Sequence, residues 1–197
     1  MTTNEPADGS IQARVNSIGE RVRSLRSSKS LGVRELARKV GITPSMLSQI
    51  ERGMVRPSVG TLFRLADGLG ITTDAFFRDD EPSFPSPLVR PDDRARMELS
   101  DGVTWERLTP GDEHDFEFMR TEYLPGAASA PELLRHAGRD YGILMEGRLE
   151  ITVGFTTYHL TPGDSIAFDA SMPHRLYNPG PGVASTIWVV LERNAVG

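Results

Sequence analysis

The chain has 197 residues, of which 38% are hydrophobic and 25% are charged, and its formal net charge is −5. These values fit one large or two small globular domains, and no apolar run approaches the roughly 18 residues that a membrane helix needs. The sequence contains no cysteine, which excludes disulfides and thiolate metal sites. Its N-terminal residues lack the basic and then apolar pattern of a secretion signal, so we expect a cytoplasmic protein.

The charge is distributed unevenly along the chain. Residues 14–78 hold 12 Lys or Arg against 5 Asp or Glu, whereas residues 79–197 hold 10 against 20. The basic N-terminal part suits binding to phosphate, and the acidic C-terminal part would repel DNA. We therefore expect two domains with different partners.

Four helices and a short helical turn are predicted in residues 14–78, after a tail at residues 1–13 whose polar composition indicates disorder. The first helix is marked by apolar residues spaced three or four apart, Val15, Ile18, Val22 and Leu25. The fourth helix begins after a cap at Ser58 and ends at Gly70, and a further helical turn starts near Thr73.

The second and third helices flank a tight turn. The second covers about residues 33–40 and ends at Gly41, because glycine takes a left-handed conformation without penalty. Thr43 then offers a side-chain oxygen to free backbone amides, and Pro44 stands at the first helical position. One face of the third helix carries only polar side chains, those of Ser45, Ser48, Gln49 and Arg52. Short polar side chains can approach base edges closely, which indicates a DNA-reading surface.

This stretch resembles the phage-repressor-like helix-turn-helix family, the xenobiotic-response-element (XRE) class. The matching residues are Leu36-Ala37, Val40-Gly41, Ser48-Gln49-Ile50-Glu51-Arg52-Gly53, Pro57-Ser58, Leu62, Leu65-Ala66 and Leu69-Gly70. The resemblance implies a DNA-binding set in which Pro44, Ser45 and Gln49 read bases and Arg52 and Arg56 contact phosphates, with Thr43 and Ser48 beside them. It also implies a largely buried ion pair between Arg26 and Glu51.

Residues 79–93 are expected to form a semi-rigid linker, because the ten residues from Pro82 to Pro91 include four prolines and each fixes its own φ. After the linker, in residues 94–197, the spacing of the apolar residues changes from the helical period to a period of two. Apolar and polar residues alternate from Leu149 to Val153, and Pro-Gly turns separate many short apolar runs. This pattern predicts an all-β barrel or sandwich.

Two segments of this region resemble the two motifs of the cupin family, whose fold is a double-stranded β-helix. The first is PGAASAPELLRHAGRDYGILMEGRLEITVG, beginning at Pro125, and the second is LTPGDSIAFDASMPHRLYNPG. Metal-binding cupins carry His-x-His and a Glu in the first motif and a His in the second. In this chain Leu134 stands at the first histidine position, and the other three positions hold His136, Asp140 and His174.

Three interpretations of the barrel stay open. As a metal centre, His136, Asp140 and His174 could hold Fe, Zn, Mn or Ni with positions left for substrate. As a metal-free pocket, the same side chains would bind a small-molecule effector beside aromatic rings. Candidates for those rings are Tyr141, Tyr158 and Tyr177. As a dimerisation shell, the barrel would only join two chains.

The combination of a helix-turn-helix and a cupin barrel resembles transcriptional regulators that sense polyamines, amino acids or catabolic intermediates. The iron-dependent epoxidase that makes fosfomycin shares this domain order and is the alternative, an enzyme. The basic N-terminal domain favours the regulator. The resemblance then implies a homodimer joined by its barrels, a palindromic DNA operator with half-sites about one helical turn apart, and an effector that acts on the DNA-binding heads through the linker.

Overall fold

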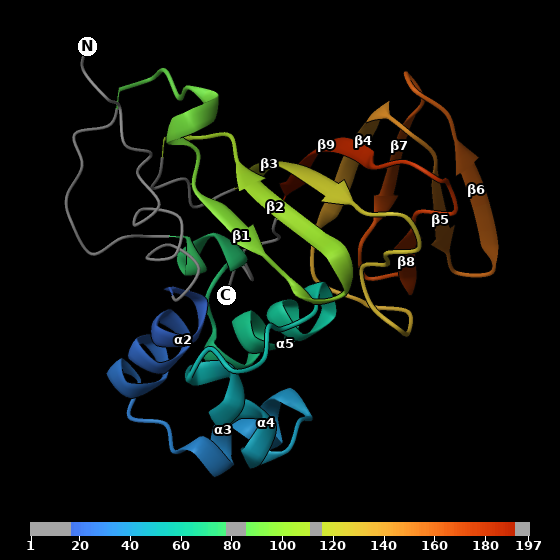
Figure 1. Ribbon diagram of the computed structural model, residues 1–197. Coiled ribbons are helices and arrows are strands. Elements are labelled where there is room, and N and C mark those ends of the chain that lie inside the picture. Colours follow the sequence, from blue (N-terminus) through green and yellow to red (C-terminus); the bar gives the residue numbers. More distant parts are fainter. Residues whose placement is uncertain (1–16, 78–85, 111–115, 192–197) are drawn as a thin grey trace.

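The structure, a computed structural model, describes residues 17–77, 86–110 and 116–191 (Figure 1). The expected tail at residues 1–13 and the first part of the expected linker, residues 79–85, lie outside the described residues. The N-terminal part contains α2 (Ser17–Ser28), α3 (Val33–Val40), α4 (Pro44–Glu51), α5 (Val59–Leu69) and the short 3-10 helix η1 (Thr73–Phe76). These are the four helices and the further turn that the sequence predicts.

Local capping explains where these helices begin and end. Gly41 has the left-handed backbone conformation, with φ 72° and ψ 33°, and it ends α3. The Thr43 hydroxyl oxygen accepts a hydrogen bond from the Met46 amide at 3.1 Å and caps α4. Ser58 caps α5 in the same way, through the Thr61 amide at 3.2 Å. The caps predicted at these positions are confirmed.

The helices enclose an apolar core built from one face of each. Its fully buried side chains include Val22, Leu36, Leu47, Leu62 and Leu65. None of the helices in the described ranges has the length and apolar character that a membrane crossing requires.

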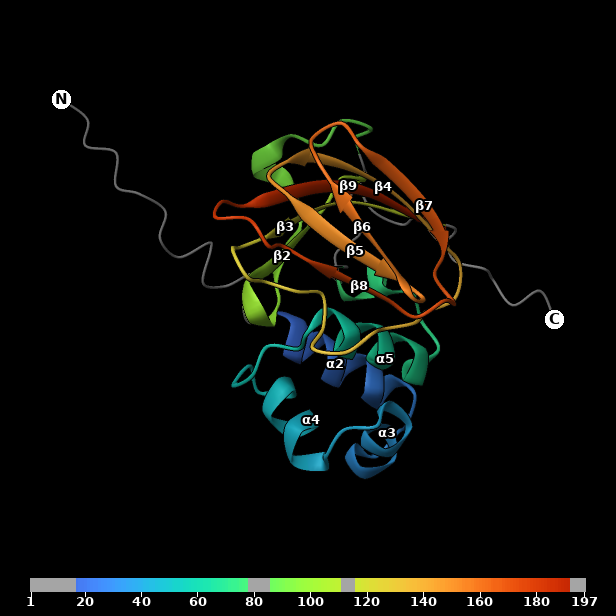
Figure 2. The ribbon, with the colours of Figure 1, turned by 90° about the vertical axis from the view of Figure 1, so that its right-hand side faces the viewer.

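The C-terminal part is a barrel of two β-sheets that face each other (Figure 2). One sheet has six strands in the order β1-β2-β3-β9-β4-β7, and the other has three in the order β6-β5-β8. The strands are β1 (Arg96–Glu98), β2 (Val103–Arg107), β3 (Phe116–Tyr123), β4 (Arg139–Glu146), β5 (Leu149–Val153), β6 (Thr156–Leu160), β7 (Ser165–Asp169), β8 (His174–Tyr177) and β9 (Ala184–Leu191). The predicted all-α and all-β parts are therefore both present.

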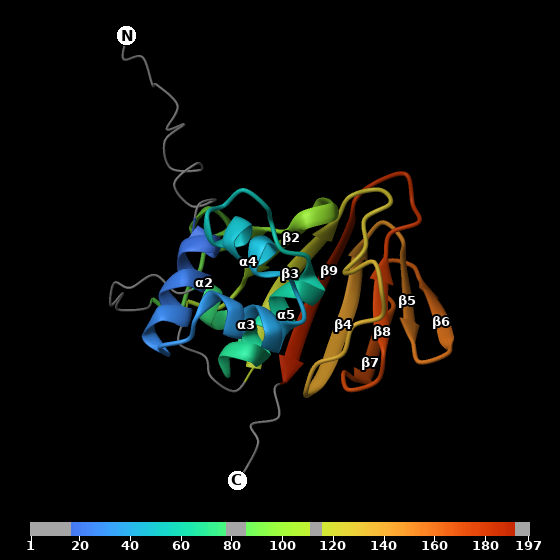
Figure 3. The same ribbon diagram turned by 90° about the horizontal axis from the view of Figure 1, so that it is seen from below.

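The helical part also contacts the barrel directly, with α5 lying between the other helices and the strands (Figure 3). At the start of α5, the Pro57 carbonyl accepts a hydrogen bond from the Ser100 amide at 3.0 Å. Beyond its end, Asp74 in η1 forms an ion pair with Arg107 of β2 at 3.2 Å. Besides the linker predicted from the sequence, these contacts connect the two parts directly.

Candidate functional site

The residues expected to contact DNA lie on α4 and in the turns on either side of it. Thr43, Pro44, Ser45, Arg52 and Arg56 are exposed, and Ser48 and Gln49 are partly exposed. The opposite face of α4 is anchored, because Leu47, Ile50 and Glu51 are buried. Apart from Arg56, which belongs to the turn before α5, these side chains are thus carried by a single supported helix and its caps.

Two of the arginines in this set have partners within the protein. The Arg52 Nε donates to the Ser48 carbonyl at 3.1 Å, which holds the guanidinium along α4. The Arg56 Nη1 lies 2.7 Å from Glu98 Oε2, at the end of β1, and both side chains are well exposed. The expected phosphate ligand Arg56 is therefore already paired with a carboxylate of the barrel.

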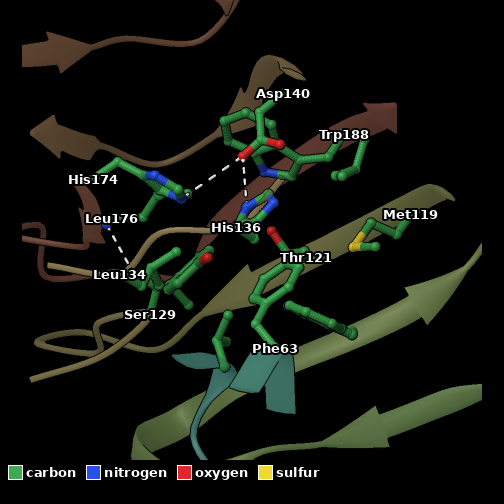
Figure 4. A pocket seen from close by; sticks show the side chains of 14 residues that line it. Phe63, Met119, Thr121, Ser129, Leu134, His136, Asp140, His174, Leu176 and Trp188 are labelled. Carbon is green, nitrogen blue, oxygen red and sulfur yellow. Dashed lines mark hydrogen bonds and ion pairs between the residues drawn. The ribbon is translucent and has the colours of Figure 1, made fainter. Parts of the chain in front are cut away.

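Inside the barrel, three titratable side chains from different segments converge (Figure 4). Asp140 comes from β4, His174 begins β8, and His136 lies in the segment before β4. The Asp140 Oδ2 is 3.4 Å from His136 Nε2 and 3.9 Å from His174 Nε2. All three side chains are at least nine-tenths buried. The three residues that the cupin resemblance singles out are thus brought together.

The pKa values of the two histidines are shifted in opposite directions. Burial lowers the pKa of His136, but the hydrogen bond and the negative charge of Asp140 together outweigh it, so this pKa is raised. Burial also lowers the pKa of His174, and the neighbouring His136 adds to that effect, so this pKa is below its ordinary value. The arrangement therefore makes His136 easier to protonate than His174.

The donor set fits a divalent metal ion. The Nδ1 atoms of His136 and His174 lie 3.2 and 2.9 Å from the carbonyls of Ala137 and Met172, so each Nε2 is directed towards Asp140. The three ligand atoms all lie within 4.8 Å of one another. Among the described residues, the buried Asp140 Oδ1 has no hydrogen-bond partner. Two imidazoles and a carboxylate are ligands that iron and zinc accept.

The triad opens onto a cavity of about 40 Å³ with mostly apolar walls. Its other lining residues are Val59, Phe63, Trp105, Met119, Thr121, Tyr123, Ser129, Leu134, Leu176, Trp188 and Val190. Two of them, Val59 and Phe63, belong to α5 of the helix-turn-helix part. The cavity is therefore lined by residues of both parts of the chain.

The tyrosines expected to flank the pocket do not line it. Tyr141 is 40% exposed and lies beside Arg139, and Tyr177 lies beside Arg175. Successive side chains of a strand point to opposite faces, so Tyr141 must point outwards when Asp140 points inwards. Tyr177 points away for the same reason, since Leu176 is a lining residue. Tyr141, Tyr158 and Tyr177 are therefore not among the residues that line this cavity.

The aromatic walls of the cavity are instead Phe63, Trp105, Tyr123 and Trp188. None of these four residues was predicted as a wall residue from the sequence, although the position of Phe63 gave an indication. Phe63 lies beside the apolar stripe of α5, which consists of Leu62, Leu65, Ala66 and Leu69. It extends the apolar face of the helix to one side, which indicates that α5 packs against a second partner.

Comparisons with known proteins agree with this architecture. The chain matches the family models described as "Helix-turn-helix" over residues 22–76 and "Cupin domain" over residues 119–190. A crystal structure of an HTH_3 family transcriptional regulator from Vibrio cholerae has the same fold, with a TM-score of 0.69, 23% identity, and coverage of 93% of this chain and 99% of that chain.

Named relatives identify the class of protein. HTH-type transcriptional regulator PuuR of Escherichia coli (strain K12) is 31% identical over 171 residues, which cover 86% of this chain and 91% of the relative. HTH-type transcriptional regulator SutR of the same organism is 26% identical over 160 residues, covering 81% and 85%. Both are regulators, which supports regulation over the epoxidase alternative. The chain therefore belongs to the XRE-type helix-turn-helix transcriptional regulators with a C-terminal cupin domain.

Proposed function

We propose that this regulator binds a two-fold symmetric DNA operator as a homodimer and that a small molecule in the barrel cavity changes its affinity for that operator. One observation carries the proposal. The cavity that holds His136, Asp140 and His174 is walled in part by α5, which also packs against the helices that support α4. A ligand there would contact the DNA-binding part directly.

Recognition of DNA follows from the surface of α4. Gln49 is suited to a bidentate contact with a base edge, and Ser45 and Ser48 can donate or accept short hydrogen bonds. Arg52 and Arg56 supply positive charge for phosphates. One such helix reads few bases, so two heads on neighbouring half-sites are needed for specificity.

The chemistry of the cavity favours an effector with an amino group, such as a polyamine or an amino acid. Asp140 is a buried carboxylate with one oxygen, Oδ1, that lacks a partner among the described residues, and a buried acceptor of this kind is costly unless a donor reaches it. Phe63, Trp105 and Trp188 provide apolar and aromatic walls for the carbon chain and for a cation.

A divalent metal is a second candidate for the same site, favoured by the two Nε2 atoms directed at Asp140. Fe, Zn, Mn or Ni would be held by His136, Asp140 and His174 and would supply a Lewis acid that binds an anionic or neutral effector. Calorimetric titration with Zn(II) tests this candidate. Stoichiometric binding that disappears in Asp140→Asn would support it.

The outer face of the six-stranded sheet suits a second copy of the chain. Its apolar side chains on β3, β9 and β4 are Phe116, Phe118, Ile187, Val189, Leu191, Tyr141, Ile143 and Met145. The strand register makes this surface continuous, because Val189 of β9 lies between Phe118 of β3 and Tyr141 of β4. Tyr141, Ile143, Met145 and Leu191 are exposed and the other four are partly exposed. A continuous outward-facing apolar surface is typical of an interaction site, and a two-fold operator requires a dimer.

The test begins with an operator that the full-length protein selects from a pool of random duplexes. Affinity for that duplex is then measured with and without putrescine, spermidine and L-arginine. The variants are His136→Ala and His174→Ala, with His159→Ala as the matched control because its side chain is 74% exposed on β6. We expect the ligand response in wild type and control and a blunted response in the other two. A response that survives both cavity substitutions would contradict the proposal.

A further inference from the structure

The barrel cavity has one wall that belongs to the DNA-binding part. Val59 and Phe63 stand one turn apart on α5, and both line the cavity. The helix lies close to the barrel, because a Cβ atom added to Gly60 would be 3.2 Å from the Cβ of Ala130. The absence of a side chain at residue 60 allows α5 to place Phe63 against the triad.

The Phe63 ring covers one of the proposed ligand-binding residues (Figure 4). It stacks on the His136 imidazole with a centroid distance of 3.9 Å and an angle of 2° between the ring planes. Trp105 of β2 meets the same phenyl ring edge to face, with centroids 5.8 Å apart. Phe63 is thus held between a barrel tryptophan and the histidine of the triad.

The space that remains is small. A cavity of about 40 Å³ has room for a few water molecules or a metal ion. A polyamine or an amino acid is larger than this, and the Phe63 ring covers the face of His136. A ligand of that size that reaches this face of His136 would therefore displace the ring.

Movement of Phe63 would alter the packing of α5 against the other helices. The adjacent residue Leu62 is fully buried in the helical core, which it shares with Leu36 of α3 and Leu47 of α4. Close-packed interiors respond to displacement by discrete repacking, since they contain little free volume. The helix α5, which packs against the two helices that support α4, is thus also part of the wall of the ligand site.

We infer that Phe63 is an effector-site residue contributed by the DNA-binding domain, and that its displacement by ligand transmits occupancy of the cavity to the operator-binding surface. The inference rests on the proposed effector site. It assigns the coupling to a direct contact between the domains, in addition to any action through the linker. Such a ligand binds more tightly when the Phe63 ring is displaced than when the ring lies against His136. This difference in affinity between two states is the condition for coupling.

The experiment compares wild type with Phe63→Ala and with a control, Phe155→Ala, whose phenyl ring is fully exposed between β5 and β6. Binding of putrescine, spermidine and L-arginine is measured by calorimetry and by tryptophan fluorescence. Both tryptophans of the chain line the cavity, so the emission reports on this site. Affinity for the selected operator is measured with and without each amine.

In wild type and control we expect an amine to bind and to change operator affinity by roughly 5- to 150-fold, the usual range of coupling. In Phe63→Ala the amine should bind at least as tightly, while the ratio of operator affinities with and without it falls close to one. Phe63→Leu, which retains an apolar side chain against Trp105, should lower the ratio in the same direction and serves if the alanine variant does not fold.

Two other outcomes would distinguish the proposed amine site from the proposed role of Phe63 in coupling. If the amine binds both Phe63 variants and the ratio stays as in wild type, the role of Phe63 is overturned while the effector site stands. If none of the amines binds any of the proteins, the proposed amine site is overturned, and the inference about Phe63 falls with it.

Discussion

Arg26 and Glu51 form a two-point ion pair that joins α2 to the end of the recognition helix α4. The Arg26 Nε lies 2.6 Å from Glu51 Oε1, and the Nη2 lies 3.0 Å from Oε2. The side chains are only 13% and 7% exposed. This pair was predicted from the resemblance to the helix-turn-helix family, and it is confirmed.

Removing one partner of this pair should destabilise the protein strongly. We expect Arg26→Met to lower the free energy of unfolding by about 3–5 kcal/mol, because Glu51 would be left as an uncompensated buried charge. Urea denaturation measures the change. The double variant Arg26→Met, Glu51→Leu is the control and should recover part of the loss, since it leaves no unpaired charge. An unchanged unfolding midpoint in Arg26→Met would contradict the importance of the pair.

Gln49 and Arg52 should affect DNA binding in different ways. Gln49→Ala is expected to cost about 1–3 kcal/mol on the selected operator and to relax preference at one base position. Arg52→Ala should weaken all duplexes more evenly and reduce the salt dependence by about one charge. Fluorescence anisotropy with operator and scrambled duplexes distinguishes the two effects. Equal losses on both duplexes for both variants would show that Gln49 is not a base reader.

Glu98 should restrain DNA binding through Arg56. The two side chains are 49% and 36% exposed, so their ion pair is worth about 0.2–1 kcal/mol. Glu98→Gln should therefore tighten binding to any duplex by at most about fivefold, and the gain should vanish when Arg56→Ala is added. Glu132→Gln removes one exposed acidic charge elsewhere and is the control for general electrostatics. An equal gain in both glutamine variants would mean that the pair has no specific role.

The outer face of β4 should carry the dimer contact. Ile143 lies opposite Ile187 of β9 and is 37% exposed. Ile143→Arg should dissociate the homodimer, because it would leave a charge unpaired in an apolar interface. Sedimentation velocity measures the oligomeric state, with Phe155→Arg as a control on another surface. A dimer that persists in Ile143→Arg would place the interface elsewhere.

The pKa values of the two cavity histidines should be shifted in opposite directions from the ordinary histidine value. We expect the pKa of His136 to be raised by Asp140 and that of His174 to be lowered by burial. Asp140→Asn should lower the pKa of His136, because burial would then act without its counter-charge. NMR titration of the imidazole resonances measures each value. The same pKa for both rings would contradict the arrangement.

The sign of the pH effect on stability follows from these directions. A raised pKa in the folded state means that protonated His136 contributes stability at pH below its unfolded pKa and loses it as pH rises through the folded value. The pKa of His174 is lowered in the folded state, so its effect on stability is the opposite. The contribution of His174 to the free energy of unfolding falls as the pH drops below its ordinary pKa. Asp140→Asn should remove the first contribution, while burial would still lower the pKa of His174.

Much of the helix-turn-helix could be predicted from the sequence, because its signals are local. Gly41 ends α3 through its own backbone conformation, and Thr43 and Pro44 define the start of α4 within a few residues. Spacing of apolar residues then gives the buried face of each helix. The alternation around Ile151 predicts strands for the same reason, since the direction of a side chain follows from its parity along the strand.

Long-range contacts could not be predicted in this way. The spacing of apolar residues does not show which residue of α5 contacts His136. Phe63 and His136 are separated by several strands along the chain, and they come into contact only in the folded protein. The pairing of Arg56 with Glu98 likewise depends on where β1 lies relative to the turn after α4.

The cavity shows the division between sequence and tertiary structure most clearly. The cupin motifs identified His136, Asp140 and His174, because each motif fixes its residues on a strand or beside one. The tertiary structure decided what surrounds them. The inward direction of Asp140 turns the adjacent Tyr141 outwards. The aromatic wall comes instead from Phe63 of α5 and from three strand residues, Trp105, Tyr123 and Trp188, because folding brings these distant segments together around the triad.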